Sequence, residues 1–282
     1  MTKEAVVLFS GGTDSTLTAA LMAEEFDKIH LITYDRFGIF QVENSKKNAQ
    51  KLVDKFGKDK FVHKVINFDK VFQKVSYQNY LKNLIKFGFM NLSTCGLCKL
   101  SMHVMTIIYC LEFQIQRVSD GANKGMDVFP AQMDSVLDEL RGMYEKFGIE
   151  YTNPVYEIDP PEEKSLIKDE NMAFIHNNIY GAKSEEQKRT GGKTTGELLY
   201  DMGLSPEANV KGSRYDQKRQ PRCFQFMLFS FYYNKWYLPI KGNSEYKKET
   251  TTFFKSKIQE ISEVIELHRN GEVQKIFNIE ES

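Results

Sequence analysis

The chain has 282 residues, of which 41% are apolar and 13% aromatic, enough for one large core or two modest ones. Lysine plus arginine and aspartate plus glutamate both number 38, which excludes a global electrostatic attraction to nucleic acid or membranes. We read no presequence before the first predicted strand, and we expect no apolar stretch to approach the roughly 20 residues that span a bilayer. The sequence therefore predicts a cytoplasmic protein with no membrane partner.

The first predicted element is a strand in the apolar run from Ala5 to Phe9, followed by a turn and by the helix-forming stretch 16–23. The turn reads Ser10-Gly11-Gly12-Thr13-Asp14-Ser15. Paired glycines let a backbone turn tightly and bring its amides close to an anion, and the helix behind them adds a positive dipole end. Ser10 and Ser15 can donate hydroxyl hydrogen bonds, and Asp14 can orient a magnesium ion or cap the helix. We predict that this turn binds nucleotide phosphates; an ordinary Gly-Gly turn is the alternative.

The next elements alternate between strands and helices. Residues 29–34 form a second apolar run that ends at Asp35, residues 44–56 have helical spacing, and residues 60–68 predict a third strand. This alternation predicts an α/β fold with a doubly wound parallel sheet and helices on both faces. Ligands gather at the carboxyl ends of such strands, where Asp35 lies.

Residues 72–92 predict a helix, and a long apolar helix to about Phe113 follows the Cys95-Gly-Leu-Cys98 segment. A strand is predicted near 116–119, and it leads into Asp120-Gly121-Ala-Asn123-Lys-Gly-Met-Asp127. Asn123 can hold a ribose or phosphate oxygen, and Asp127 can help to bind magnesium, which prefers oxygen ligands. A surface turn is the other interpretation of this segment.

Three prolines between 153 and 163 predict a boundary between residues 1–160, the nucleotide-binding domain, and residues 161–282, a smaller substrate or lid lobe. Within the second unit, 181–212 predicts a lid or substrate loop, and 224–240 predicts a hairpin that turns at Asn234-Lys235. A final helix is predicted near 252–269.

The cysteines suggest a metal site. Cys95 and Cys98 lie three residues apart at the start of a predicted helix, where both sulfurs can point toward one ion, and Cys223 is a third candidate. Cys110 is predicted to be a core residue. Three cysteines fit a zinc ion with a fourth ligand such as His103, or an iron-sulfur cluster with one iron left open. A buried reduced pair or a thioredoxin-like dithiol is the alternative for the close pair.

A local basic stretch lies just before Cys223, opposed by the single acid Asp216. It can seat RNA phosphates or steady the charge of ATP, and a solvated loop is the alternative. Its basic residues are Lys211, Arg214, Lys218, Arg219 and Arg222.

The Ser10–Ser15 turn resembles the Ser-Gly-Gly-x-Asp-Ser signature of the PP-loop ATP pyrophosphatases, and it lacks the Gly-Lys-Ser/Thr ending of a Walker loop. The resemblance implies a Rossmann-like, adenine nucleotide alpha hydrolase-like fold with a smaller C-terminal α+β lobe. It also implies that ATP is cleaved to AMP and pyrophosphate while a substrate oxygen is adenylylated. The segment with Gly121 and Asn123 resembles the second nucleotide-side loop of that family, which closes over ATP.

The segment from Ser93 to Leu100 is similar to the Cys-x-x-Cys of tRNA thiolation enzymes of the 2-thiocytidine and 2-thiouridine type. In those enzymes, two cysteines here and one over a hundred residues later hold a 4Fe-4S cluster whose free iron carries sulfide to the adenylylated base. Cys223 follows Cys98 by 125 residues, so the likeness implies a cluster on Cys95, Cys98 and Cys223. The arginine pair that often follows this motif is replaced by Lys99-Leu100.

The predicted function is therefore an ATP- and magnesium-dependent sulfurtransferase that thiolates a nucleobase or a related carbonyl-type oxygen. Its partners would be tRNA or a small-molecule acceptor, a sulfur-donor protein or free sulfide, and, as one option, a second copy in a homodimer. One alternative is an ammonia-dependent ligase similar to the 7-cyano-7-deazaguanine synthases. Another is a non-catalytic module that binds a nucleotide or nucleic acid.

Overall fold

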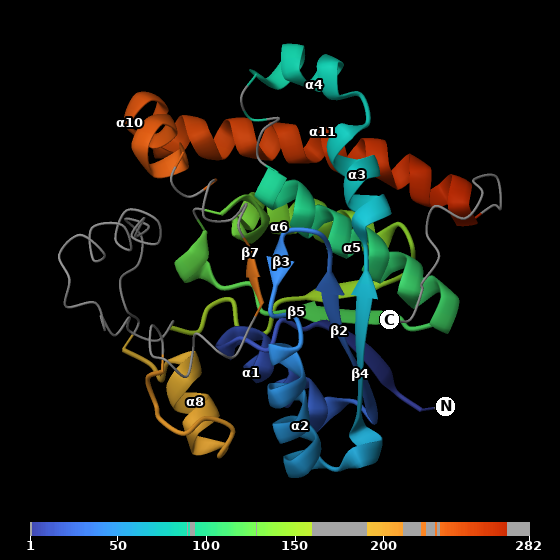
Figure 1. Ribbon diagram of the computed structural model, residues 1–282, viewed down its shortest axis with the longest axis vertical. Coiled ribbons are helices and arrows are strands. Elements are labelled where there is room, and N and C mark those ends of the chain that lie inside the picture. Colours follow the sequence, from blue (N-terminus) through green and yellow to red (C-terminus); the bar gives the residue numbers. More distant parts are fainter. Residues whose placement is uncertain are drawn as a thin grey trace.

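The computed structural model describes residues 2–88, 90, 94–127, 129–159, 191–210, 221–223, 229 and 232–269. Its centre is a five-stranded sheet in the order β4-β2-β1-β5-β6, in which every neighbouring pair is parallel (Figure 1). A second sheet pairs β3 with β7 in antiparallel register. The strands are β1 Glu4–Leu8, β2 Lys28–Asp35, β3 Ile39–Phe40, β4 Phe61–Asn67, β5 Arg117–Asp120, β6 Glu150–Thr152 and β7 Arg222–Cys223.

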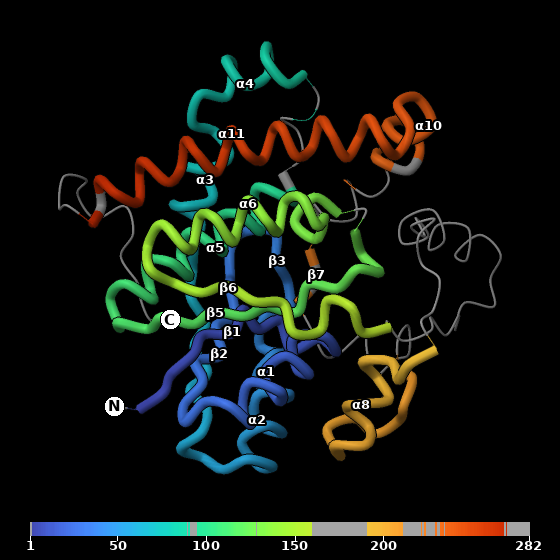
Figure 2. The backbone as a smooth tube through the Cα atoms, turned by 180° about the vertical axis from the view of Figure 1, so that it is seen from behind, coloured from blue at the N-terminus to red at the C-terminus, as the bar shows by residue number. Residues whose placement is uncertain are grey.

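Helices cover both faces of the parallel sheet. One face carries α1 and α2, with α8 packed against α1, and the other carries α3, α5 and α6 (Figure 1). The long helix α11 lies outside α6 and α5 as a further layer (Figure 2). The helices are α1 Thr13–Glu25, α2 Asn44–Phe56, α3 Asp69–Tyr77, α4 Tyr80–Phe87, α5 Thr94–Phe113, α6 Asp134–Glu145, α8 Thr195–Asp201, α10 Leu238–Lys241 and α11 Asn243–Arg269.

Two apolar cores follow from the alternation of side chains along the central strand. Ala5 and Val7 of β1 belong to the core beneath α1 and α2, whereas Val6 and Leu8 belong to the core beneath α5 and α6. A strand that is buried on both faces has a continuous apolar run rather than an alternating one. The fold is thus α/β, Rossmann-like and doubly wound, as predicted.

The strand order reverses at β1, because β2 and β4 lie on one side of it and β5 and β6 lie on the other. The turns after β1 and β5 therefore diverge to opposite faces and leave a crevice at the carboxyl ends of the strands, which is the usual ligand site of such sheets. This switch point positions the candidate site.

Most elements predicted up to residue 120 are confirmed, including α2 with its expected bounds. The predicted helix over 72–92 is two helices, α3 and α4, because Asn79 between them has a left-handed backbone with φ 53°. The strand β6 and the helix α6, which complete the sheet and its cover, were not predicted.

The predicted hairpin in 224–240 is wrong over the residues that the structure describes. Tyr233–Tyr237 forms a π-helical turn that continues into α10, and residues 224–228 lie outside the described part. An aromatic run fits a buried helix as well as a strand by composition alone. Here the ring of Tyr233 packs on Tyr246 of α11, with centroids 4.4 Å apart. Helix α11 itself begins at Asn243, before the predicted start at residue 252.

One expectation about apolar stretches is also wrong. Within the described ranges, one helical stretch, Cys95–Phe113 of α5, is long and apolar enough to cross a bilayer by length and composition. Most of it is buried inside the protein, where it packs against α3 and β1. The predicted domain boundary at residue 160 falls at the start of a segment outside the described residues.

Candidate functional site

The turn after β1 is closed by its own serines and glycines. Gly11 has a φ of +77°, a left-handed conformation that glycine adopts without strain, and Gly12 is the residue before α1. The Gly12 amide donates to Ser10 Oγ at 3.2 Å, and Ser15 Oγ donates to the Gly12 carbonyl at 3.2 Å. The two serine hydroxyls lie 3.1 Å apart. No side chain makes a capping hydrogen bond at the start of α1. Asp14 lies in the first turn of this helix, near the positive end of the helix dipole.

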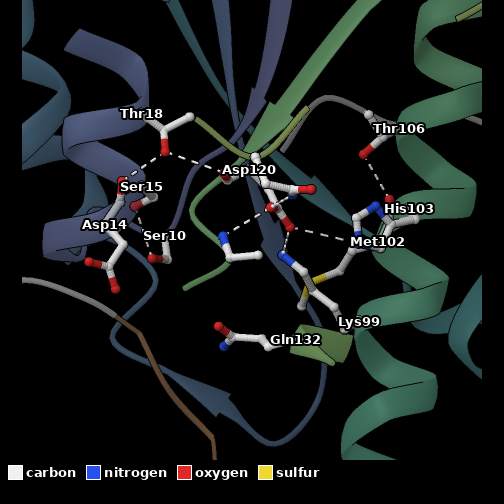
Figure 3. A network of polar contacts seen from close by, with 12 residues as sticks. Ser10, Asp14, Ser15, Thr18, Lys99, Met102, His103, Thr106, Asp120 and Gln132 are labelled. Carbon is white, nitrogen blue, oxygen red and sulfur yellow. Dashed lines mark hydrogen bonds and ion pairs between the residues drawn. The ribbon is translucent and has the colours of Figure 1, made fainter. Parts of the chain in front are cut away.

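Neighbouring elements fix this turn from both sides. Asn48 of α2 donates its amide to the Gly11 carbonyl at 2.7 Å. From the other side, a Cβ at Gly121 would lie 2.5 Å from the Ser15 backbone nitrogen, so only glycine allows the β5 turn to approach so closely. The Thr18 hydroxyl lies 2.9 Å from the Asp14 carbonyl and 3.3 Å from the Asp120 carbonyl, which links the two turns (Figure 3).

A cavity of about 400 Å³ opens where the two turns meet. The β1 turn and the β5 turn form two of its walls, and α5 contributes Lys99 and Met102. Pro221 and Cys223, from the far end of the chain, form part of another wall. The predicted site residues that line the cavity are Ser10, Gly12, Thr13, Asp14, Ser15, Gly121, Asn123 and Cys223.

Asp120, at the end of β5, is a fully buried carboxylate within this wall. Its Oδ2 is 2.9 Å from Lys99 Nζ, and its Oδ1 accepts hydrogen bonds from Asn153 Nδ2 at 2.7 Å and the Ala122 amide at 3.0 Å. Burial raises the pKa of Asp120, but Lys99 and the other donors outweigh burial and lower this pKa to about 2. Asp120 is therefore charged at neutral pH and holds Lys99 at the cavity (Figure 3).

His103 is a buried neighbour of this pair. Its Nδ1 lies 3.0 Å from the Tyr144 hydroxyl, and its Nε2 lies 3.9 Å from Asp120 Oδ2. Burial and the charge of Lys99 lower the pKa of His103 to about 3 despite Asp120, so the ring is neutral at neutral pH. His103 therefore belongs to the carboxylate side of the site, and within the described residues it forms no metal-binding group with the cysteines.

The side chains of two further predicted ligand residues, Asn123 and Asp127, have partners within the protein. Asn123 is fully buried and uses both ends of its amide: Oδ1 accepts from the Gly125 amide at 2.8 Å, and Nδ2 donates to the Ile158 carbonyl at 3.1 Å. Asp127 pairs with Lys247 of α11 at 3.1 Å. Neither Asp127 nor Asp35 lines the cavity.

Two of the three predicted cysteine ligands contact a buried arginine. Arg36, just after β2, donates from Nε to Cys98 Sγ at 3.1 Å and from Nη2 to Cys223 Sγ at 3.9 Å. Its guanidinium stacks on the Phe72 ring at 4.2 Å. Cys223 reaches this place because β7 pairs with β3, with Cys223 opposite Ile39. The structure therefore brings Cys223 next to the Cys-x-x-Cys helix, as the predicted metal site requires.

Burial and mutual repulsion of the sulfurs raise the pKa of the Cys95 thiol. Burial also raises the pKa of Cys98, but the adjacent Arg36 opposes this and the pKa settles at about 11. Cys110 is buried, and its thiol pKa is also raised by burial. It belongs to the apolar core, as predicted.

Over the described ranges, no three His, Cys, Asp or Glu side chains come close enough to hold a metal ion. A compact zinc site is therefore not formed by these residues. An iron-sulfur cluster is larger than an ion and takes one thiolate per iron, so three neighbouring thiols are a suitable donor set for it. The basic residues Lys211, Arg214, Lys218 and Arg219 lie outside the described residues.

Three residues of the site were not predicted: Lys99, Asp120 and Arg36. Asp120 had a signal, because it ends a parallel strand directly before a glycine. Lys99 and Arg36 had none, since a lysine or arginine in a turn or helix is usually a solvated surface residue.

One family profile matches more than half of the chain. The profile of DUF7411, described as a family of unknown function, matches residues 3–173. A search of curated proteins found no match.

Among solved structures, one similar chain is a predicted subunit of tRNA methyltransferase from Methanocaldococcus jannaschii. It is 21% identical, with a TM-score of 0.35, and the match covers 78% of this chain and 96% of that chain. Another is the U34-tRNA thiolase NcsA from Methanococcus maripaludis with its 4Fe-4S cluster. It is 13% identical, with a TM-score of 0.41, and the match covers 93% of this chain and 73% of that chain.

Proposed function

Because the chain belongs to the DUF7411 family, whose function is unknown, we propose an activity from the site itself. The protein is an ATP-dependent enzyme that cleaves ATP to AMP and pyrophosphate and adenylylates an acceptor oxygen. In its finer form, the proposal is a sulfurtransferase that thiolates a nucleobase of tRNA, the substrate implied by the Cys-x-x-Cys resemblance.

One observation carries the proposal: the two glycine turns meet at the switch point of the sheet. Gly121 packs directly on the Ser15 backbone, so the β1 turn and the first residues of α1 line a cavity that the β5 turn closes. Backbone amides at a helix N-terminus bind phosphates. The arrangement suits a pyrophosphate leaving group, whose developing charge these amides would stabilise.

Lys99 supplies the cation that the turn lacks. A Walker loop places its lysine within the phosphate-binding sequence itself, and this turn has none. Lys99 comes from α5 instead, and Asp120 holds its ammonium group 2.9 Å away at the cavity wall. A lysine restrained in this way can neutralise phosphate charge while the carboxylate keeps it in place.

Magnesium fits Asp14, the cavity-lining carboxylate that is not paired with Lys99. This ion usually takes one or two carboxylates together with substrate phosphates. Asp14 meets that requirement, because it lies in the cavity wall at the first turn of α1. Bound there, the ion would neutralise charge on the departing pyrophosphate. Asp127 is paired with Lys247, so it would have to leave this lysine in order to bind the ion.

The cysteines support the sulfur-transfer part of the proposal. Cys223 lines the same cavity as the phosphate turn, so its sulfur lies where an adenylylated acceptor would be held. A 4Fe-4S cluster on Cys95, Cys98 and Cys223, the cofactor that we propose, would have one iron open to carry sulfide. Arg36, which donates to two of these sulfurs, would orient the ligands.

The test of the ATP chemistry uses ATP labelled on the α-phosphate, with magnesium and bulk tRNA. We expect labelled AMP and free pyrophosphate, and we expect Asp14→Asn to abolish both. Asp59→Asn, an exposed carboxylate in the short turn before β4, is the matched control. Formation of ADP, or no nucleotide cleavage with any acceptor, would refute the proposal.

The sulfur-transfer part has its own test. Anaerobically purified protein should be brown and contain iron and acid-labile sulfide, and Cys98→Ser should lose both while it still binds ATP. Colourless protein with no iron would remove the cluster from the proposal. Equal loss of ATP binding in Cys98→Ser would contradict the separate roles of the glycine turns and the cysteines.

A further inference from the structure

An exposed aromatic ring, Phe37, lies next in sequence to the arginine that contacts the cysteines. Phe37 has 90% of its surface exposed, although it directly follows the buried Arg36 that contacts Cys98 and Cys223. Two residues later, Ile39 lines the cavity. Phe37 is therefore an exposed aromatic ring within two residues of the cavity lining, which makes it a candidate contact for a molecule that enters the cavity.

The backbone around Phe37 is held rigidly. The Ile39 amide donates to the Arg36 carbonyl at 3.0 Å, which closes a turn with Phe37 and Gly38 at its corner, and Gly38 has a φ of +90°. The Phe37 amide donates to both Asp69 oxygens, at 3.1 and 3.3 Å, and its carbonyl accepts from Arg36 Nη1 at 2.6 Å. The turn therefore displays the ring in a preorganised position, which reduces the entropy lost on binding a partner.

Helix α3, which begins at Asp69, continues this surface away from the cavity. Val71, Phe72 and Val75 face the core. The opposite face carries two cations, an amide and an aromatic ring at helical spacing: Lys70, Gln73, Lys74 and Tyr77. We call Phe37 together with these four residues the Phe37–α3 surface.

The charge of this region is entirely positive beyond Asp69. Residues 70–88 contain four lysines and no carboxylate, in a chain whose net charge is zero. Asp69 itself uses its oxygens to hold the Phe37 amide and the Asn67 side chain. Glu260 of α11, which accepts a hydrogen bond from Asn79 just beyond Tyr77, is paired with Lys257. A local surface of this kind attracts a polyanion even though the whole protein does not.

Aromatic rings interspersed with lysines are the pattern of a surface for single-stranded nucleic acid. Bases stack on the rings irrespective of sequence, and the lysines contact phosphates. A protein partner would need exposed aliphatic side chains that become buried on binding, and Leu81 and Ile85, which are exposed in this way, lie on α4 rather than on α3. A second copy of the chain would bring lysines against lysines, which is unfavourable.

We propose that the Phe37–α3 surface binds an unpaired strand of RNA, with one base stacked on Phe37 and phosphates along Lys70 and Lys74. This inference rests on the proposed function, because it names the surface that presents the acceptor base to the site. The stacked base lies one residue away from Arg36 and thus beside the sulfurs that Arg36 contacts.

The first experiment turns Phe37 into a reporter. The chain has a single tryptophan, Trp236, so Phe37→Trp in a Trp236→Phe background gives one fluorescent ring at this position. Titration with short single-stranded RNA oligonucleotides and with bulk tRNA should quench its emission, because a base stacks on the indole. Tyr200→Trp in the same background, on the exposed face of α8, is the matched control and should not respond.

The second experiment removes the contacts. Phe37→Ala should weaken RNA binding by about 5- to 150-fold, the loss of one base–aromatic stack, and Phe37→Tyr should restore it. Lys70→Gln with Lys74→Gln should reduce the slope of log affinity against log salt by about 1.4, the value for two contacts to single strands. Lys58→Gln with Lys60→Gln, at the opposite end of the sheet, should leave the slope unchanged.

The outcomes separate this inference from the proposed function. Binding is measured without ATP, so quenching by RNA supports the surface even if AMP never forms. If AMP forms with an RNA acceptor but Phe37→Trp is not quenched and Phe37→Ala binds normally, the surface is wrong while the function stands. Unchanged RNA affinity in all variants would also overturn the inference, and so would equal quenching of both tryptophan reporters. A protein would then be the alternative partner for this surface.

Discussion

The cavity has two walls of different origin. The phosphate wall is built from two turns that each follow a parallel strand directly, after β1 and after β5, and it is closed by backbone contacts such as that of Gly121 with Ser15. The cysteine wall is Cys223 of β7, which lines the cavity, together with two residues behind it: Arg36 after β2 and Cys98 on α5, whose sulfur shares the Arg36 guanidinium with Cys223. The first wall is fixed by strand topology, whereas the second depends on side chains and on the packing of later elements.

This difference predicts how each wall fails. A change in the phosphate wall meets backbone atoms that cannot move, so it should eliminate function with little room for compensation. A change in the cysteine wall meets side chains, so its effect should be smaller and open to rescue by a second substitution. Four predictions, from the largest effect to the smallest, test this contrast.

Gly121→Ala should have the largest effect. Its Cβ would lie 2.5 Å from the Ser15 nitrogen and 2.7 Å from the Asp14 carbonyl carbon, so the two turns must move apart. A displacement of about 1 Å at a site costs roughly 100-fold in activity, and we expect a comparable loss of ATP-dependent AMP formation. Gly142→Ala on α6, where no atom lies within 4 Å of the new Cβ, is the control. Equal activity of the two variants would contradict the close contact between the turns.

Asp120→Asn should destabilise the protein by about 3 kcal/mol in denaturant unfolding, because it leaves Lys99 without its counter-charge in a buried wall. Lys99→Met combined with Asp120→Asn should recover much of that stability, since no unpaired charge is then left. ATP binding should be weak in the double variant, because the Lys99 cation is absent. Additive losses of stability would show that the two groups do not interact.

The stability of the unmodified protein should fall in acid because of the Asp120–Lys99 pair. The pKa of Asp120 is lowered to about 2 in the folded state, whereas an unfolded aspartate has a pKa of about 3.9. The folded state therefore gains stability from this group above pH 4, and that gain is lost as the pH falls from about 4 to about 2. The loss amounts to about 2–3 kcal/mol, which is the difference of about 1.9 between the two pKa values converted at 1.36 kcal/mol per pKa unit. Asp120→Asn should show a flatter decline over this range.

The phosphate wall was easier to predict from the sequence than the cysteine wall. The Ser10–Ser15 turn, Gly121 and the parallel sheet were predictable, because strand alternation and paired glycines are local signals. Arg36 and Lys99 were not, because their roles depend on distances between segments far apart in the chain. Asn123 was predicted as a ligand or as part of a turn: its contact with the Gly125 amide is the local turn contact, whereas its contact with Ile158, 35 residues away, could not be predicted from local sequence.

Gly96→Ala, between the two cysteines of α5, should have a smaller effect that can be rescued. The new Cβ would lie 2.3 Å from Phe254 Cζ and 3.1 Å from Pro130 Cβ, so α11 must shift or the Phe254 ring must turn. Overpacking of this kind costs about 1–3 kcal/mol, measured as a lower midpoint of denaturant unfolding. Phe254→Leu should relieve the clash in the double variant, because a smaller side chain opens the space. The cysteine wall would then tolerate a change that the phosphate wall cannot, since the atoms that yield at Gly96 belong to a side chain whereas those at Gly121 belong to the backbone. If Phe254→Leu gives no rescue, the position of α11 is as rigid as the phosphate turn, and the contrast between the two walls fails.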